Sequence, residues 1–241
     1  MEFLVEQSPG SAPTVHLTFT PDESTTTFTD ALALADNAGP DAAIWVHGTN
    51  DERREILTGR GLVSNRTLLQ MRAPLPVAAT TLVTRPFTDD DIDEFVAVNN
   101  RAFHWHPEQS GLTSDAVRRD MATEWFDADG FLLHHIDGAL AGFCWTKIHR
   151  DPEHLGANRN TRNLGEIYVI AVDPAFHGQG LGKAMTLAGL DWLANAGLET
   201  AMLYVESDNL AAVATYERIG FTTYRTDTLW HRSPIENPSN Q

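Results

Sequence analysis

The feature that most constrains this chain is a glycine-rich turn between an apolar strand and a helix. Residues 172–185 read VDPAFHGQGLGKAM, with glycine at positions 178, 180 and 182. Glycine accepts positive φ angles and lets a ligand approach the main chain closely. The helix that follows presents unpaired N–H groups and the positive end of its dipole. The turn therefore predicts a site for an anion, and phosphate is the usual guest of such a site.

Strand and helix patterns alternate through residues 80–232. The dipeptide Asp137-Gly138 predicts a tight hairpin, and glycine closes the last two helices at positions 197 and 220. The order of elements predicts an α/β fold (an α+β mixed sheet) with helices on its faces. Apolar or β-branched runs predict strands at 81–87, 130–136, 139–149, 164–172, 200–207 and 221–232. Helical periodicity predicts helices at 89–103, 114–125, 180–197 and 209–220.

The first third of the chain repeats part of this order. Strands at 14–19, 42–48 and 66–74 and helices at 28–39 and 51–62 follow the order of residues 163–232. In this copy the glycine turn has become ESTTTF, so we expect no bound pyrophosphate there. Residues 73–79 are rich in proline and small side chains, which is typical of a linker. We predict a partial, degenerate domain at 1–72, a linker at 73–79 and a complete domain at 80–241, with the first domain as a structural support.

Charge and cysteine content exclude several classes of function. A net charge of −16 argues against nucleic acid or an anionic membrane as a partner. The single cysteine, Cys144, lies in an apolar run, which predicts a buried thiol and excludes an internal disulfide. No apolar run approaches the roughly 20 residues of a membrane helix, and the acidic N-terminus is unlike a signal peptide. We expect a soluble, monomeric, cytoplasmic protein.

Three kinds of phosphate loop compete for the glycine-rich turn. A Walker A loop fails because His177 and Ala184 replace its first glycine and its hydroxyl residue. A Rossmann turn fails because Met185 replaces its third glycine. The remaining pattern, HGQGLG after a V-x-P strand end, resembles the pyrophosphate loop of the GCN5-related N-acetyltransferases, which cradles coenzyme A. His177 replaces the Gln or Arg of that pattern, at a position where the contact is largely through the backbone. A glycine-rich helix cap without a ligand is the alternative.

Four longer strings narrow this resemblance. NNRAFHWHPEQSG, FCWTKIHRD, GEIYVIAVDP and LYVESDNLAAVATYERIGFTTY are similar, in this order, to the mycothiol synthase family, whose members carry two such domains in tandem. The resemblance implies that acetyl-CoA binds along a strand that splays from its neighbour, on the glycine loop, and at the start of the last helix. The residues implied are Ile170, Ala171, Val172, His177, Gly178, Gln179, Gly180, Leu181, Gly182, Lys183, Asn209, Leu210, Ala211, Ala212, Val213 and Ala214.

The resemblance also implies a catalytic apparatus. An attacking amine must be neutral, the oxyanion needs N–H donors, and the thiolate needs a proton as it leaves. Glu166 lies near the start of an otherwise apolar strand and is expected to be the base. Tyr216 lies on roughly the same helix face as Asn209 and is expected to be the acid. A backbone N–H near Val172 is the expected donor to the thioester carbonyl.

By the same resemblance, the acceptor is a cysteinyl-glucosaminyl-inositol, whose α-amine is acetylated to give mycothiol. The positions that match the substrate contacts are Glu108, Lys147, Glu166 and Tyr204. Taken alone, Glu108 and Lys147 are ordinary solvated charges. The histidines show no metal-ligand spacing, so we expect no metal and assign these side chains to the surface or the core: His104, His106, His134, His135 and His149.

Two alternatives stay open. The chain could acetylate another small amine, such as an aminoglycoside or an amino acid. It could also be a non-catalytic acyl-CoA sensor, which the degenerate first copy favours. The intact loop, Glu166 and Tyr216 argue against a sensor.

Overall fold

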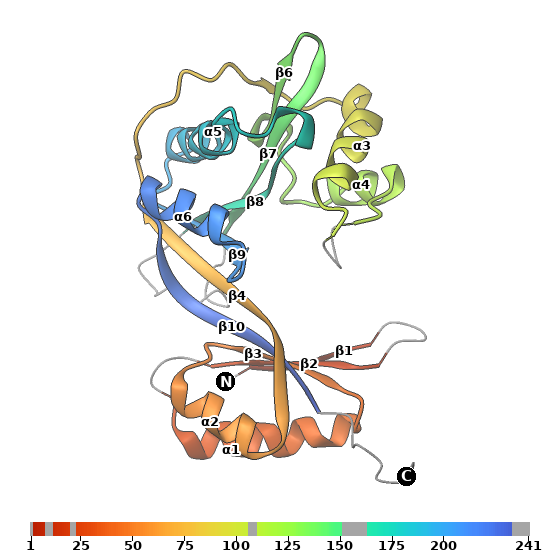
Figure 1. Cartoon of the computed structure of the whole chain (residues 1–241), viewed down its shortest axis with the longest axis vertical. Helices are drawn as coiled ribbons and strands as arrows, with labels where there is room; N and C mark the ends of the chain where they lie inside the picture. The colour runs from red at the N-terminus through yellow and green to blue at the C-terminus, as the bar shows by residue number, and fades with distance from the viewer. Residues whose placement is uncertain (1, 8–11, 20–22, 106–109, 151–162, 233–241) are drawn as a thin grey trace. The chain divides into compact units, whose positions relative to one another are not determined.

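The computed structural model describes residues 2–7, 12–19, 23–105, 110–150 and 163–232 (Figure 1). By their contacts, these residues group into two compact units. The described residues of Met1–Met71, Val205–Leu210 and Thr223–Gln241 form unit 1, and those of Arg72–Tyr204 and Ala211–Thr222 form unit 2. The predicted domains at 1–72, 73–79 and 80–241 are continuous segments of the chain. Each of the two units instead combines segments that are separated in the sequence.

The sheet of unit 2 has the strand order β9-β8-β7-β6-β5. Strands β8 and β9 are parallel, and the other neighbours are antiparallel, so the predicted mixed α/β sheet is confirmed. Asp137 and Gly138 both have positive φ at the predicted hairpin between β6 and β7. The strands are β5 (Arg85–Pro86), β6 (Phe131–Ile136), β7 (Ala139–His149), β8 (Leu164–Val172) and β9 (Thr200–Glu206).

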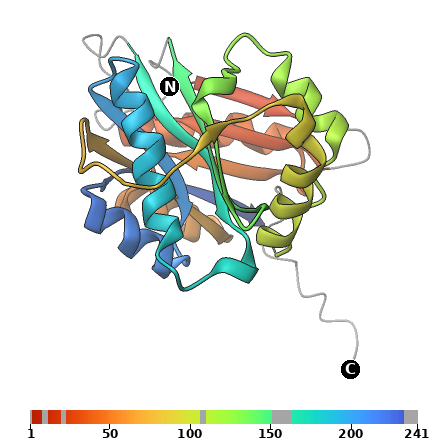
Figure 2. The ribbon, with the colours of Figure 1, turned by 90° about the horizontal axis from the view of Figure 1, so that it is seen from above.

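Helices cover both faces of the strands β7 and β8. Figure 2 shows the pair α3 and α4 on one side of these strands and α5 on the other. Helix α5 lies close to the sheet because Gly189 has no side chain. A Cβ atom at Gly189 would approach the Cys144 Sγ to 2.5 Å and the Ile167 Cδ1 to 2.7 Å. The helices are α3 (Ile92–Ala102), α4 (Ser114–Met121), α5 (Leu181–Asn195) and α6 (Leu210–Ile219).

An aromatic core joins α3 to this sheet. The Phe131 ring stacks on the Trp145 ring at 4.6 Å between centroids, and the Phe95 ring of α3 meets both Phe131 and Phe143 edge-on. Each of these four side chains is almost completely buried. Aromatic pairs in such geometries add about 0.5–1.5 kcal/mol beyond the burial of their surface. This core fixes the face of β7 and β8 on which the candidate site lies.

The sheet of unit 1 has the strand order β1-β2-β3-β10-β4. Strands β2 and β3 are parallel, whereas β1 pairs antiparallel with β2 and β10 pairs antiparallel with β3. Figure 1 shows the helices α1 and α2 on the same side of this sheet. The elements are β1 (Glu2–Glu6), β2 (Thr14–Thr18), β3 (Ala43–His47), β4 (Leu62–Pro74), β10 (Thr222–Arg232), α1 (Thr25–Ala35) and α2 (Asp51–Gly59). Short 3-10 turns occur at Asp36–Ala38, Asp89–Asp91, Ala128–Gly130 and Pro174–Phe176.

The last strand of the chain completes the core of unit 1. Asp227–Trp230 of β10 pair with His47–Ile44 of β3. The Trp230 side chain is 2% exposed and belongs to the apolar cluster formed by β2, β3, α1 and α2. The final strand of the chain, which was predicted as part of the domain at 80–241, therefore belongs to the unit that is built mainly from the first 71 residues.

Candidate active site

The glycine loop has the backbone that the sequence predicts. Gly178 and Gly180 have φ of +79° and +76°, a region that other residues rarely adopt. A Cβ atom at Gly178, Gly180 or Gly182 would meet nothing within 4 Å, so the space in front of the loop is open. The N–H of Ala184 donates to Gly180 O at 3.2 Å and is the first bond of the α5 ladder. The N–H groups of the preceding turn are available to an anion.

Asp173 and Arg101 hold the start of this loop. Asp173 accepts the Ala175 N–H at 2.9 Å and the Arg101 Nε–H at 3.0 Å. Burial raises the pKa of Asp173, but the hydrogen bonds from Ala175 and Arg101 outweigh this effect, and the resulting pKa is lowered. The Nε2–H of His177 donates to Val172 O at 3.0 Å, which turns that ring back toward the strand. The loop is therefore fixed to α3 and β8.

Strand β8 separates from β9 before the loop begins. Their ladder includes Gly165, Glu166 and Ile167 and ends there, although β8 continues to Val172. The predicted cofactor-binding residues 170–172 thus lie where the ladder with β9 has ended, within a described stretch of chain. The backbone groups on that edge of β8 can pair with an extended, amide-containing ligand.

Lys147 and Glu166 lie directly opposite each other on β7 and β8 and share a face of the sheet. The Lys147 Nζ lies 4.4 Å from the centroid of the Trp125 ring and 5.2 Å from that of Tyr168. Tyr168 occupies a β-bulge, because Trp145 pairs with Val169 and the next residue of β7 pairs with Ile167. Bulges often redirect a side chain beside an active site, and Tyr168 is 36% exposed.

Glu166 is buried and paired with a histidine. Only 7% of the residue is exposed, and its Oε2 lies 2.7 Å from the Nε2 of His149. Tyr204 lies on the same face, because it packs with Leu164 and Met202. The structure therefore brings together three of the predicted acceptor residues, Lys147, Glu166 and Tyr204. The fourth, Glu108, lies outside the described residues.

The sequence assigned His149 to the surface or the core and missed its contact with Glu166. His149 and Glu166 are separated by 17 positions and meet diagonally across the β7–β8 pair. The register of the two strands is the signal that would have found this contact, and it cannot be counted without knowing the bulge at Tyr168.

Tyr216 lies near the face of the sheet opposite to the one that carries Glu166 and Lys147. It is close to Cys144, whose Sγ faces Gly189 of α5. Its ring is half-buried on α6 and contacts the Phe221 ring at 5.8 Å. Burial raises the pKa of Tyr216 to about 12, and the nearby Cys144 adds to the effect. Burial also raises the pKa of the Cys144 thiol to about 12, in agreement with the predicted buried cysteine. Tyr216 therefore keeps its proton near neutral pH and can donate it.

The remaining predicted cofactor residues belong to the start of α6. The Asn209 N–H donates to Glu206 O at 3.0 Å, immediately before the helix. Residues 210–214 form the first turns of α6, and the Leu210 side chain is 74% exposed. Lys183 likewise lies in the first turn of α5.

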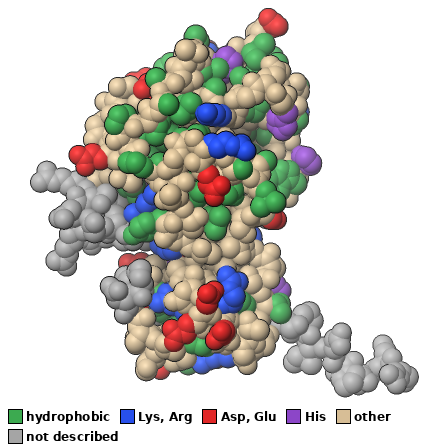
Figure 3. Space-filling view, turned by 60° about the vertical axis from the view of Figure 1, so that its left-hand side comes forward, with side chains coloured by type: hydrophobic (Ala, Val, Ile, Leu, Met, Phe, Trp, Pro, Cys, Tyr) green, Lys and Arg blue, Asp and Glu red, His purple; other side chains and the backbone are tan. Residues whose placement is uncertain are grey.

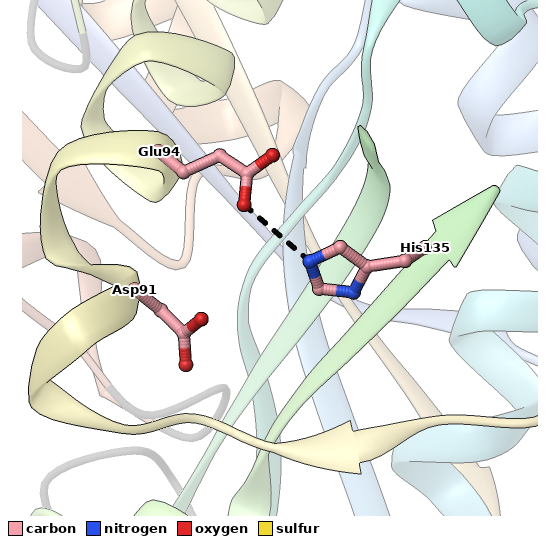
Figure 4. A group of neighbouring side chains, drawn as sticks. All are labelled: Asp91, Glu94 and His135. Atoms are coloured by element: carbon pink, nitrogen blue, oxygen red, sulfur yellow. Dashed lines mark hydrogen bonds and ion pairs between the residues drawn. The ribbon is translucent and has the colours of Figure 1, made fainter. Parts of the chain in front are cut away.

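A second polar cluster contains Asp91, Glu94 and His135 (Figure 4). Each side chain offers one atom of the kind that binds metal ions, a carboxylate oxygen or a ring nitrogen, and these atoms lie within 4.8 Å of one another. Arg85 binds both oxygens of Asp91, at 2.7 and 2.5 Å, and this contact is the main reason why the pKa of Asp91 falls to about 2. The other carboxylate, Glu94, accepts the Leu140 N–H at 2.9 Å. We interpret the cluster as an ion-pair network that ties α3 to the β6–β7 hairpin.

Two further observations concern the charge on one face of the molecule and the apolar character of its helices. On the face shown in Figure 3, Lys and Arg side chains are scattered among acidic and apolar ones. Among the described residues, no helix is both long enough and apolar enough to cross a membrane.

The fold and the loop define an acetyl-transferring enzyme. Residues 96–221 match the acetyltransferase (GNAT) family. A GCN5-related N-acetyltransferase from Sphaerobacter thermophilus shares the fold with a TM-score of 0.65 at 15% identity, over 90% of this chain and 72% of that one. A tandem GNAT protein from the clavulanic acid pathway has a TM-score of 0.60 at 14% identity, over 95% of this chain and 77% of its own.

Comparison with curated relatives identifies the subfamily of acetyltransferases to which the chain belongs. The mycothiol acetyltransferase of Amycolatopsis mediterranei is 43% identical over 83% of this chain and 68% of its own length. The corresponding proteins of Rhodococcus erythropolis and Acidothermus cellulolyticus are 40% and 37% identical, over 84% and 95% of this chain and 70% and 74% of their own. The chain belongs to the mycothiol acetyltransferase family within the GNAT acetyltransferases, which confirms the resemblance seen in the sequence.

Proposed function

We propose that this chain transfers the acetyl group of acetyl-CoA to the cysteinyl α-amine of cysteinyl-glucosaminyl-inositol and so forms mycothiol. The observation that carries the proposal is the buried Glu166, opposite Lys147, just where β8 separates from β9. The names of the curated relatives support the choice of acceptor.

The residues around the loop suit acetyl-CoA, which supplies the acetyl group. The N–H groups of Leu181, Gly182 and Lys183 would bind the pyrophosphate, aided by the dipole of α5. The free edge of β8 at residues 170–172 would pair with the amides of the pantetheine arm. Open space at all three loop glycines agrees with this placement.

The proposed proton transfers use both faces of the sheet. Glu166 accepts a proton from the acceptor ammonium, and the neutral nitrogen attacks the thioester carbon. A backbone N–H near Val172 donates to the carbonyl oxygen as negative charge develops there. Tyr216 donates its proton to the sulfur as the C–S bond breaks, and the second proton that the nitrogen must lose to become an amide passes through water to the Tyr216 phenolate. Because Glu166 and Tyr216 lie near opposite faces, the reacting carbon belongs in the gap between β8 and β9.

The acceptor carries one cation and many hydroxyl groups. Glu166 would attract the ammonium, and Lys147 and Tyr204 would donate hydrogen bonds to hydroxyl oxygens on the same face. The half-exposed rings of Trp125 and Tyr168 offer flat apolar surfaces beside them. Glu108 is proposed as a further contact on the basis of its sequence match alone.

A thiol-release assay tests the proposal. Acetyl-CoA is supplied with cysteinyl-glucosaminyl-inositol, and separately with an aminoglycoside and with free amino acids. Rapid thiol release with the first acceptor alone supports the proposal. Preference for another amine would assign a different acceptor. Binding of acetyl-CoA without turnover on any amine would favour the sensor.

A further inference from the structure

We infer that His149 is a positioning residue that holds the carboxylate of Glu166 in the orientation needed to accept the acceptor's proton. This inference rests on the proposed role of Glu166 as the base. The contact joins Glu166 Oε2 to His149 Nε2 at 2.7 Å, and the two side chains are 9% and 10% exposed. Few solvent molecules can compete with a contact that is buried to this extent.

The chemistry of the pair fixes the direction of the hydrogen bond. An ionised carboxylate only accepts hydrogen bonds, so the His149 Nε2 carries the proton and donates it. This bond occupies Oε2 and leaves Oε1 to take a proton from the acceptor. A carboxylate on a flexible side chain would otherwise sample several rotamers, and a misplacement of about 1 Å can cost a catalyst roughly 10²-fold in rate.

The other charged and titratable groups near Glu166 are engaged differently. Lys147 lies opposite on β7, and its ammonium rests on the rings of Trp125 and Tyr168. Tyr168 itself lies close enough to Glu166 and to Asp120 of α4 for both charges to raise its pKa, although burial is the larger cause. Tyr204 of β9 shares the face. Within residues 110–150 and 163–232, His149 is the group that the structure places at hydrogen-bond distance from the Glu166 carboxylate.

A purely structural contact would also satisfy a buried carboxylate, so the test must separate positioning from stability. His149→Leu removes the donor, whereas His149→Gln places an amide N–H near the position of Nε2. His134→Leu is the matched control. His134 lies on β6, and its ring makes an exposed hydrogen bond to Val83 O instead of a contact with Glu166. All three are compared with the intact chain by steady-state kinetics and thermal unfolding.

We expect His149→Leu to lower kcat by roughly 10- to 100-fold with an unchanged KM for acetyl-CoA. The loss should shrink at higher pH, where more of the acceptor amine is already neutral. His149→Gln should recover the rate to within a few-fold, and His134→Leu should match the wild type. If His149→Leu folds poorly, His149→Asn replaces it, because its shorter amide cannot reach Glu166 and should give the same loss.

Two results would overturn the inference. One is a wild-type kcat in His149→Leu while Glu166→Gln is inactive, which would leave the proposed base intact. The other is an equal loss in the Gln and Leu variants, which would mean that the donor is not what matters. A fully active Glu166→Gln would instead overturn the proposed base and this inference together.

Discussion

Glu166 is an acid buried on a strand whose neighbours are apolar, at the face that also carries Lys147. We expect Glu166→Gln to lower kcat by roughly 10²–10⁴, the usual contribution of a positioned base. The optimum should move to higher pH, because the amine must then lose its proton to solvent. Steady-state kinetics across pH check this. Wild-type rates near neutral pH would place the base elsewhere.

For Tyr216 we propose the complementary task, which is to donate a proton to the leaving thiolate. Since its pKa is raised to about 12, chiefly by burial, the phenol stays protonated until the pH approaches that value. Activity should therefore not decline through ionisation of Tyr216 at moderately alkaline pH. Tyr216→Phe should lower kcat roughly 10²-fold while the KM for the acceptor stays unchanged. A variant that kept the wild-type kcat would show that water protonates the leaving thiolate.

Trp125 is expected to affect acceptor binding because its ring holds the Lys147 ammonium, a proposed acceptor contact. Its ring lies 4.4 Å from the Lys147 Nζ, and such contacts are worth about 0.5–2 kcal/mol. Trp125→Leu should free the ammonium and raise the acceptor KM by about 2- to 30-fold, with little change for acetyl-CoA. Trp105→Leu is the control, because Trp105 is 53% exposed. Equal KM values for the acceptor would remove Trp125 from its recognition.

At the scale of elements, we propose that the glycine loop and the start of α5 bind the cofactor. Gly182→Val is the cleanest test, because Gly182 has no positive φ and a Cβ there meets no protein atom within 4 Å. The new side chain would instead obstruct the pyrophosphate. Losing one charge-assisted hydrogen bond costs about 1.5–3 kcal/mol, so the KM for acetyl-CoA should rise roughly tenfold or more.

Gly59→Val serves as the control for that variant. Gly59 ends α2, also lacks positive φ, and faces open space. It should leave the KM for acetyl-CoA unchanged. A folded Gly182→Val with normal affinity for acetyl-CoA would remove the loop from the cofactor site.

The sequence predicted those elements whose signals are local. The loop glycines, the Asp137-Gly138 hairpin and the apolar strand β8 each carry their pattern within a few residues, and the structure has them in place. Strand β1 was missed because all five of its residues are exposed, so no buried face produces an alternating pattern. The strand predicted at 81–87 is only two residues long, Arg85–Pro86, because Pro86 has no N–H to donate to a strand ladder.

Features that depend on pairing between distant segments were not predictable from local patterns. The bulge at Tyr168 and the contact of His149 with Glu166 follow from the β7–β8 register. The partner of β10 is β3, about 180 positions away in the chain, although the sequence placed β10 in the second domain. Periodicity reports which face of a strand is buried and not which strand lies beside it.

At the scale of the whole molecule, α1 of the predicted first copy differs at its N-terminus from α5. The Ser24 side chain accepts the Thr27 N–H at 3.3 Å and so caps α1. The residue before α5, Gly180, has no side chain to provide such a cap. We predict one acetyl-CoA per chain, bound by the second copy. Isothermal titration measures the stoichiometry. A value of two would contradict the expectation that the first copy binds none.

We predict that the final strand makes the first part of the chain necessary for the stability of the whole. β10 pairs with β3, and Trp230 is buried in the core of unit 1. A fragment of residues 80–241 would retain β10 and lose β3, which leaves Trp230 and a strand edge exposed. We predict that this fragment unfolds at a temperature lower by on the order of 10 °C than the whole chain and tends to associate.

Trp230→Ala in the full chain tests the same contact without truncation. Removing a buried tryptophan costs about 3–5 kcal/mol, so calorimetry should show a similar loss of stability, while Trp105→Ala should change little. Gel filtration of the fragment reports its association. If the fragment were monomeric, fully active and as stable as the whole chain, residues 13–76 would not support the rest of the protein. The pairing of β3 with β10 would then contribute nothing that the second copy needs.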